Sequence, residues 1–332
     1  MTAPERDTQR LAFACNALER DSIHLERASS DAGFRSYWRA RDGERSWVVM
    51  DSPPELEDVR SWLRLQRVLG AGGVRVPQVL AADEASGFLL LEDLGRDTLL
   101  DVMDASSAAT WFDAAIAELV RLQSIPCPAD LPVYDEAMLR RELALFRDWY
   151  LLRNLALPLN GDDEQALQSA FDELVAHALA QPRVLVHRDF MPRNLMPNGA
   201  GLAVLDFQDA VRGPVSYDPL CLFKDAFVSW PESQVAQWLE RYRQAAADAG
   251  LPVPDARAFR RDTDLIGVHR HLKVLGIFAR LKLRDGKPRY IADAPRFLAY
   301  LNAVLPRHPE LRPLEAFFAS RLRPALRAHA AA

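Results

Sequence analysis

The residues best suited to do chemistry in this chain lie in two short segments beyond its midpoint. The first runs from His187 to Asn194 and reads HRDFMPRN, and the second begins at Asp206 and reads DFQ. Phosphoryl transfer from Mg-ATP needs a carboxylate that orients and deprotonates an incoming hydroxyl. It also needs an amide and a second carboxylate that hold magnesium on the phosphates. The pattern therefore predicts Asp189 as the catalytic base and Asn194 and Asp206 as ligands of Mg²⁺.

The sequence between these two segments supplies the geometry that a shared metal requires. Residues 194–197 and 202–205 read as two short strands around an Asn-Gly pair at 198–199, a strong signal for a tight turn. A hairpin of this kind brings the start of its first strand beside the end of its second, and therefore Asn194 beside Asp206. Two oxygen ligands of one hard cation need this placement.

The residues around these groups have less certain roles. His187 is read as a brace for the loop, because Asp189 already takes the part of the base. Arg188 either pairs with an acidic group or lines the substrate cleft, and Asp209 either supports the preceding metal ligand or faces the substrate. We assign both to the substrate site. Asp218 either caps a helix or braces the catalytic loop.

Size, charge and cysteine content limit the class of protein. The 332 residues, 49% hydrophobic and 26% charged, suffice for one large domain or two lobes with a sizeable core. The net charge of -5 argues against a nucleic-acid partner, and no apolar run reaches the roughly 20 residues of a membrane span. Cys15, Cys127 and Cys221 follow no metal-binding spacing and are expected as free thiols. We expect a cytoplasmic monomer.

The first 95 residues read as a small lobe built on an antiparallel sheet. The pattern predicts a helix over 6–20, strands at 23–27, 35–40 and 46–50, a helix from Pro53 to about Leu69, and strands at 79–82 and 88–95. This order is that of a kinase small lobe. Its exit falls where such a fold places the hinge, so we expect Glu92 and Leu94 to contact the nucleotide.

The loop between the first two strands is small and polar. Hydroxyl groups of Ser29 and Ser30, with backbone amides as far as Gly33, are able to cradle phosphate. The loop has one glycine where a protein-kinase phosphate loop has three. A phosphate loop and a plain structural loop therefore both remain open.

The third strand departs from the usual kinase pattern. Kinase-like folds place a lysine there, which contacts the α- and β-phosphates and pairs with a glutamate of the following helix. Met50 stands at that position, and no lysine occurs earlier in the chain. Arg35 or Arg39, on the neighbouring strand, is therefore our candidate for the phosphate contact. The acidic partner, Glu55 or Glu57, loses its usual lysine.

From about residue 98 the pattern is mainly helical. We predict an ATP-binding lobe at 1–95 and a larger lobe at 96–332, with the catalytic hairpin at 184–207. The predicted fold class is α+β: a protein-kinase-like two-lobed fold with a small antiparallel β-sheet lobe and a larger, mainly helical lobe.

Several stretches resemble the aminoglycoside phosphotransferase and choline kinase group, whose members phosphorylate small-molecule hydroxyls. HRDFMPRN and LDFQDAVRGPVSYD carry this resemblance. SSDAGFRSYWR, VVMDSPPE and HRHLKVLGIFARLKLRDGKPRY are similar to one branch of it, the bacterial anomeric kinases for N-acetylmuramate and N-acetylglucosamine of cell-wall sugar recycling. The resemblance covers residues 28 to about 300.

The resemblance implies that ATP donates its γ-phosphate to the C1 hydroxyl of an amino sugar. It also places Arg270, His271 and Lys273, on a late helix, near the acceptor. Cations suit this place, because N-acetylmuramate carries a lactyl carboxylate. A plain exposed helix face is the alternative for each of the three.

Two other functions remain open. An aminoglycoside or other small-alcohol phosphotransferase fits the motifs, but a polycationic antibiotic favours an acidic cleft, and residues 270–287 are rich in Arg, Lys and His. A nucleotide-binding pseudokinase fits Met50, but Asp189, Asn194 and Asp206 are all present. Turnover of Mg-ATP with an acceptor separates an enzyme from a pseudokinase.

Overall fold

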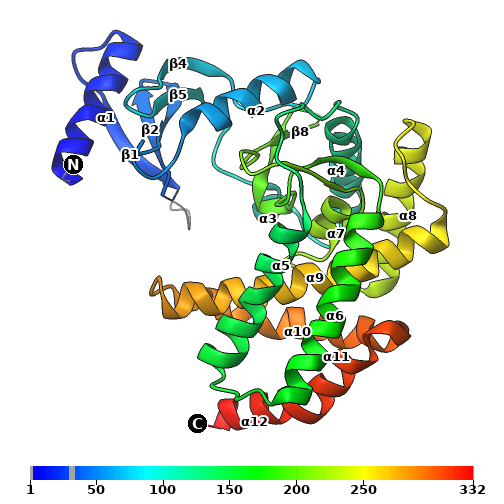
Figure 1. Cartoon of the computed structure of the whole chain (residues 1–332). Helices are drawn as coiled ribbons and strands as arrows, with labels where there is room; N and C mark the ends of the chain where they lie inside the picture. The colour runs from blue at the N-terminus through cyan, green and yellow to red at the C-terminus, as the bar shows by residue number, and fades with distance from the viewer. Residues whose placement is uncertain (1–2, 30–33, 200, 332) are drawn as a thin grey trace. The chain divides into compact units, whose positions relative to one another are not determined.

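The computed structural model describes residues 3–29, 34–199 and 201–331 (Figure 1). The chain divides into two compact units. Unit 1 comprises Met1–Ile125 and Pro192–Ala210, and unit 2 comprises Pro126–Met191 and Val211–Ala332. Across the described residues, every helix is too short or too polar to cross a membrane.

Unit 1 contains a five-stranded antiparallel sheet in the order β1-β2-β3-β5-β4, which confirms the predicted small sheet. Its strands are β1 (His24–Ser29), β2 (Ser36–Asp42), β3 (Arg45–Asp51), β4 (Val79–Asp83) and β5 (Phe88–Glu92). Gly43 makes the turn between β2 and β3 with a φ of 60°, a backbone conformation that favours glycine. Strand β5 ends at Glu92, three residues before the predicted end.

Helix α1 (Ala3–Leu18) packs against this sheet (Figure 1). A buried apolar cluster joins the two, and its members are Ala14, Val49 and Leu90. Arg6 and Arg10 of α1 both contact the carboxylate of Asp51 in β3, at 2.7 and 2.9 Å. All three charged side chains are buried. A buried carboxylate that meets two guanidinium groups fixes the helix on the strand.

Helix α2 (Val59–Ala71) begins later than the sequence pattern predicts. The carbonyl of Pro53 accepts the backbone N–H groups of Leu56 and Glu57, so this segment forms a turn. Asp58 then caps the helix by accepting the N–H of Arg60 at 3.0 Å. The predicted start at Pro53 was wrong because an aspartate five residues later provides a better N-cap.

The rest of unit 1 includes the hairpin predicted to bind the metal. Its elements are α3 (Leu99–Val102), α4 (Ala108–Gln123), the 3-10 turn Pro192–Asn194, β7 (Leu195–Asn198) and β8 (Gly201–Val204). The N–H of Val204 donates to the carbonyl of Arg75 at 2.8 Å, and Trp62 packs on Phe207 with ring centroids 5.0 Å apart. These contacts attach the hairpin to unit 1, which therefore extends beyond the predicted boundary at residue 95.

Unit 2 is mainly helical. Its helices are α5 (Glu136–Leu145), the π-helix Phe146–Asn154, α6 (Gly161–Ala180), α7 (Tyr217–Phe223), α8 (Glu232–Asp248), α9 (Ala256–Leu283), the 3-10 helix Pro288–Asp293, α10 (Ala294–Val304), the 3-10 helices Leu305–Arg307 and Pro309–Leu311, α11 (Arg312–Phe317), the π-helix Phe318–Leu322 and α12 (Arg323–Ala331). Strands β6 (Arg183–Val186) and β9 (Val211–Pro214) pair antiparallel. Strand β9 was not predicted, since its VRGP sequence lacks a strand pattern.

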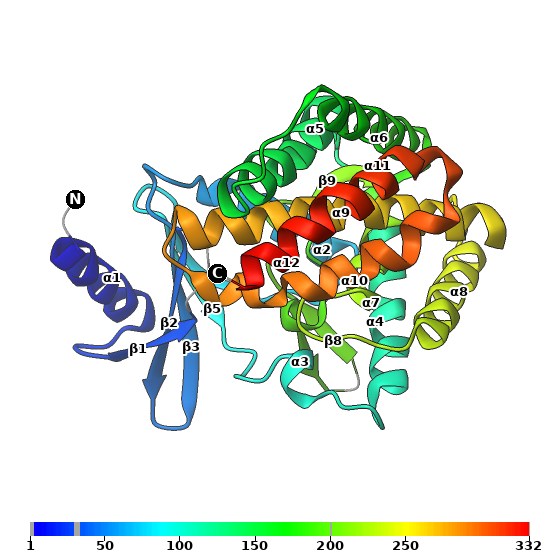
Figure 2. The ribbon, with the colours of Figure 1, turned by 90° about the horizontal axis from the view of Figure 1, so that it is seen from below.

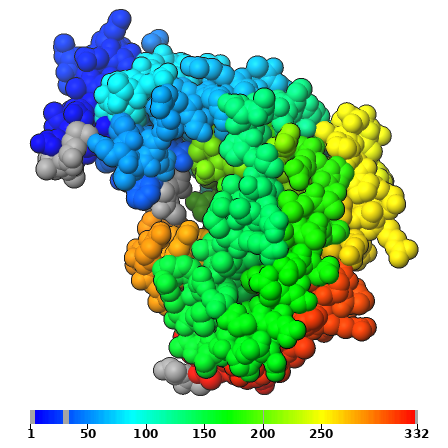
Figure 3. All heavy atoms as spheres, in the orientation of Figure 1, coloured from blue at the N-terminus to red at the C-terminus, as the bar shows by residue number. Residues whose placement is uncertain are grey.

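Helix α9 lies at the centre of unit 2. It contacts α5, α6, α7, α8 and α10, and is buried along most of its length (Figure 2). Helix α6 also packs against α5 and α11, and side chains fill the space between them in Figure 3. The apolar residues that predicted this helix, Val268, Leu272, Leu275 and Phe278, are all buried.

Gly276 of α9 lies against the end of α5. A Cβ atom at this position would lie 2.3 Å from the carbonyl carbon of Leu145. We expect Gly276→Ala to lower the free energy of unfolding by about 3 kcal/mol, because the methyl group would meet backbone that cannot rotate away. Urea denaturation followed by circular dichroism measures the change.

Gly161→Ala in α6 is the matched control, because a Cβ there meets no atom within 4 Å. We expect it to change the free energy of unfolding by at most about 0.5 kcal/mol. Equal effects of the two variants would contradict the close approach of α9 to α5.

Candidate active site

The HRD segment of unit 2 turns sharply after strand β6. Arg188 has a φ of 76°, in the left-handed region that non-glycine residues seldom adopt. Asp218, fully buried in the first turn of α7, accepts the N–H of His187 at 2.7 Å and that of Arg188 at 3.0 Å. Ser216, rather than Asp218, is the N-cap residue of α7. Asp218 is therefore the brace of the loop, one of the two alternatives that the sequence left open.

Asp189 follows directly on this turn. Its backbone N–H donates to Nδ1 of His187 at 3.3 Å, and the His187 ring packs edge-on against Phe190 with centroids 5.8 Å apart. His187 is buried, whereas Asp189 is only partly buried. These contacts support the interpretation of His187 as a brace. They leave the Asp189 side chain in the half-open position that a base acting on a substrate requires.

A buried carboxylate in α5, Glu142, collects three donors of unit 2. It accepts from Arg188 Nη2 at 2.5 Å, from Lys273 Nζ at 3.0 Å, and from the hydroxyl of Tyr134. Lys273 also donates to the hydroxyl of Tyr217 at 3.2 Å. Burial by itself would raise the pKa of Glu142, but Lys273 and Arg188 lower it to about 2. Glu142 therefore stays ionised and ties the HRD turn to α9.

Arg188 thus has an acidic partner, the first of the two roles that its sequence position allowed. The substrate contacts assigned to Arg188 and Lys273 stay predictions, because both cations are already engaged by Glu142. Sequence reasoning missed Glu142. It is one of two acidic residues on α5, and nothing in the local pattern distinguishes it.

The other two candidates on α9 are also buried. Arg270 and His271 are 2% and 1% exposed, so the alternative of an exposed helix face was wrong for both. Burial lowers the pKa of His271 well below its ordinary value, and its ring lies 5.0 Å from that of Tyr300. The Arg270 guanidinium makes one long hydrogen bond, of 3.5 Å, to the carbonyl of Lys224. Their contact with an acceptor stays a prediction.

The predicted metal ligands lie in unit 1, at the open end of the hairpin. Leu195 pairs with Val204, and the N–H of Leu205 donates to the Asn194 carbonyl at 2.8 Å, as predicted for a hairpin that brings Asn194 beside Asp206. Asp206 has a φ of 60°. A strained backbone at a carboxylate of this kind points to function.

The donor set fits Mg²⁺. An amide oxygen and a carboxylate are the hard ligands that magnesium prefers, and the ion usually takes its remaining ligands from water and substrate phosphates. No group of three or more His, Cys, Asp or Glu side chains suited to a metal occurs in the described part of the chain. The assignment of Asn194 and Asp206 therefore stays a prediction that relies on nucleotide phosphates to complete the site.

The residues predicted to contact the nucleotide differ in their partners and exposure. Glu92 pairs with Arg75 and accepts the N–H of Gln78 at 3.3 Å, whereas Leu94 is half-buried. Ser29 ends β1, and Ser30 and Gly33 lie outside the described residues. Asp209, assigned to the substrate, is exposed. Contacts of all these residues with ligands stay predictions.

Arg39, the other candidate for the phosphate contact, already has partners, and its contact with phosphate stays a prediction. Its guanidinium binds both carboxylate oxygens of Asp93, at 2.6 and 3.0 Å, and the carbonyl of Gly95 at 2.6 Å. It anchors the segment that follows β5. Arg35 instead pairs with Glu57.

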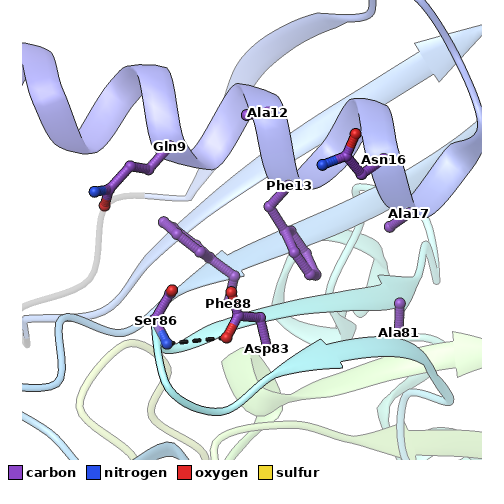
Figure 4. Close-up of a pocket in the computed structure, with 9 residues that line it drawn as sticks. All are labelled: Gln9, Ala12, Phe13, Asn16, Ala17, Ala81, Asp83, Ser86 and Phe88. Carbon is purple, nitrogen blue, oxygen red and sulfur yellow. Dashed lines mark hydrogen bonds between the residues drawn. The ribbon is translucent and has the colours of Figure 1, made fainter.

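One pocket of unit 1 lies between α1 and strands β4 and β5 (Figure 4). Its lining residues are Gln9, Ala12, Phe13, Asn16, Ala17, Ala81, Asp83, Ser86 and Phe88. Phe13 and Phe88 stack with centroids 5.5 Å apart. The lining holds no cation and includes the carboxylate of Asp83, so this pocket is unsuited to phosphate.

The cysteines agree with expectation. Cys15, Cys127 and Cys221 are free thiols. Cys221 is buried, and its Sγ lies 3.4 Å from the carbonyl of Arg188. Burial raises the pKa of the Cys221 thiol, which therefore stays protonated at neutral pH.

The brace at Asp218 gives the site a predicted pH dependence. Burial raises the pKa of Asp218 to about 6, and only the ionised carboxylate accepts through both oxygens with full strength. We therefore expect turnover to fall as the pH drops below about 6. The same shift makes folding stability decrease as the pH rises from about 4 to about 6, because the unfolded chain loses this proton first.

A pH–rate profile of the wild type and of Asp218→Asn tests this. The amide cannot ionise, so we expect the variant to be slow throughout and to lack the acid limb near about pH 6. An unchanged acid limb in the variant would assign that limb to another group.

Proteins of known class align with most of this chain. The chain matches the phosphotransferase enzyme family over residues 24–249. It is 53% identical, over 294 residues, to the N-acetylmuramate/N-acetylglucosamine kinase of Pseudomonas aeruginosa, with 88% of this chain and 87% of that protein covered. A kinase of the same name from Neisseria meningitidis is 46% identical over 304 residues, with 90% of each covered.

Solved structures show the same fold at low sequence identity. Choline kinase LicA from Streptococcus pneumoniae has a TM-score of 0.63 at 14% identity and covers 90% of this chain and 99% of its own. ADP-bound aminoglycoside phosphotransferase APH(2'')-Ib has a TM-score of 0.61 at 16% identity, with 89% and 97% covered. The resemblance to both groups is confirmed. The chain belongs to the phosphotransferase enzyme family and has the α+β, protein-kinase-like fold that its motifs predict.

Proposed function

We propose that this protein is a sugar kinase that transfers the γ-phosphate of ATP to the anomeric C1 hydroxyl of N-acetylmuramate or N-acetylglucosamine. The observation that carries the proposal is the 53% identity to a kinase named for these two sugars, over 88% of the chain. The braced HRD turn, which presents a half-open Asp189, supports the same chemistry. A role in cell-wall sugar recycling, in the cytoplasm where ATP is available, follows from these substrates.

In this proposal Asp189 orients the C1 hydroxyl and accepts its proton. The C1 oxygen forms the new bond to the γ-phosphorus, the bond from that phosphorus to the β-γ bridging oxygen breaks, and ADP leaves with the electron pair. Asn194 and Asp206 would hold Mg²⁺, which would supply positive charge to neutralise the phosphate oxygens. The fixed turn at Arg188 contributes by placing Asp189 before the substrate binds.

The acceptor side of the proposal rests on α9. Arg270 is a buried cation without a carboxylate within ion-pair distance among its described contacts, and its pKa stays above the ordinary value although burial by itself would lower it. A buried positive charge of this kind suits an anionic acceptor, such as the lactyl carboxylate of N-acetylmuramate. It suits a polycationic aminoglycoside poorly.

Replacement of the base tests the chemistry. We expect Asp189→Asn to lower kcat by about a thousandfold or more while Mg-ATP still binds, because positioning and proton acceptance are lost together. Phosphorus NMR with N-acetylmuramate follows the sugar 1-phosphate signal. Turnover within about tenfold of the wild type would refute the role of Asp189.

The same assay tests the acceptor. A phosphomonoester signal without the coupling of an anomeric phosphate would move the reaction to another hydroxyl. ATP binding without turnover on any alcohol would favour a pseudokinase.

The metal assignment has its own test. We expect Asp206→Asn to raise the Mg²⁺ concentration for half-maximal activity by about tenfold or more, since one anionic ligand is lost. Asp42→Asn is the control, because that aspartate pairs with Arg20 at the exposed end of β2. An identical Mg²⁺ titration of the two variants would contradict Asp206 as a ligand.

A further inference from the structure

The third strand of unit 1 has an apolar side chain where kinase-like folds have a lysine. Met50 in β3 is completely buried and pairs in register with Tyr37 of β2 and Leu89 of β5. Its side chain therefore contributes to packing and not to charge. The phosphate contact that the lysine normally supplies must come from elsewhere, or the site must do without it.

Arg35 is placed to supply that contact. It directly precedes β2, whose register pairs Ser36 with Asp51 and Tyr37 with Met50. Because side chains alternate along an extended chain, Arg35 falls on the same face as Tyr37, two residues away. Since Tyr37 pairs with Met50, Arg35 is a diagonal neighbour of Met50 on that face. Diagonal neighbours of this kind on adjacent antiparallel strands lie within reach of a long side chain. An arginine at 35 can therefore place its charge where a lysine at 50 would.

The acidic partner of Arg35 corresponds to the partner of the lysine in kinase-like folds. The Nε atom of Arg35 pairs with Glu57, which lies between β3 and the N-cap of α2. In kinase-like folds the acidic partner of the lysine also comes from the segment that follows the third strand. Glu57, which has no lysine partner here, therefore pairs with an arginine that directly precedes the adjacent strand β2.

The exposure of this pair is intermediate. The side chains of Arg35 and Glu57 are 15% and 21% exposed, against 73% and 54% for the neighbouring surface pair of Arg60 and Asp58. The pair is therefore shielded enough to be held in place and open enough to meet a ligand. A guanidinium has five N–H donors, so Arg35 can bind Glu57 through one edge and an anion through another.

We propose that Arg35 contacts the α- and β-phosphates of the bound nucleotide and that Glu57 is its positioning residue. The pair replaces the lysine–glutamate pair of kinase-like folds, with the cation moved from the third strand to the second. This inference rests on the proposed kinase function and names the residue that holds the donor. Arg39 is less suited to this role because its guanidinium already makes three hydrogen bonds to Asp93 and Gly95.

Isothermal titration calorimetry with Mg-ADP and with adenosine tests the proposal. We expect Arg35→Ala to weaken Mg-ADP binding by about ten- to hundredfold, the usual cost of a lost charge-assisted contact, and to leave adenosine binding unchanged. Arg35→Lys should be intermediate because it keeps the charge and loses the fork. Glu57→Gln should weaken Mg-ADP binding by several-fold. Arg41→Ala, which removes another arginine–glutamate pair from β2, is the matched control and should have no effect.

The outcomes separate this inference from the proposed function. Mg-ADP affinity of Arg35→Ala within about twofold of the wild type, or equal losses for Mg-ADP and adenosine, would overturn the inference and leave the kinase intact. If Arg35→Ala does not fold, Arg35→Lys and Glu57→Gln decide in the same way. If Mg-ADP binding depends on Arg35 but no sugar is phosphorylated, the inference holds and the proposed sugar acceptor is refuted. A wild-type protein that binds no Mg-ADP would refute both the inference and the proposed function.

Discussion

The HRD turn of this protein depends on one buried carboxylate. Arg188 holds a left-handed backbone conformation that costs about 1 kcal/mol or more for a residue with a side chain. The two hydrogen bonds that Asp218 accepts from consecutive N–H groups offset this cost and fix the direction in which Asp189 leaves the turn. Glu142 holds the same segment from the side-chain end through Arg188. Backbone and side chain of one residue are thus held by two separate carboxylates.

Charge in unit 2 is arranged to support this turn. Glu142 is shared by two cations, one from the HRD segment and one from α9, so its own burial is compensated. Removal of either cation would leave a buried carboxylate with one partner fewer, which is costly in a medium of low polarity. Arg270, in contrast, is buried on the same helix with only a long contact to a carbonyl. The helix therefore carries one cation with a carboxylate partner and one that hydrogen-bonds to a carbonyl.

The sequence predicted those features that depend on local signals. The hairpin that aligns Asn194 with Asp206 follows from an Asn-Gly turn between two short apolar runs, and the succession of strands along the chain follows from further runs and turns. Glu57, the partner of Arg35, was one of two candidates in the sequence. Glu142 and the partner of Arg39 could not be predicted, because each pair joins residues far apart in the chain. The predicted start of α2 was wrong because Pro53 and Asp58 are both plausible helix starts in the sequence. Only the hydrogen bonds of the folded backbone distinguish them.

The division of the chain between its two units has a consequence for how the protein can be cut into pieces. Residues 192–210 belong to unit 1 although they lie between the two segments of unit 2 in sequence. A fragment that ends at Ile125 would lack the strand that bonds to Arg75 and the ring that covers Trp62. Such a fragment would expose apolar surface and an unpaired backbone carbonyl. Unit 1 is therefore not a portable module, and only a rearranged chain order would make it one.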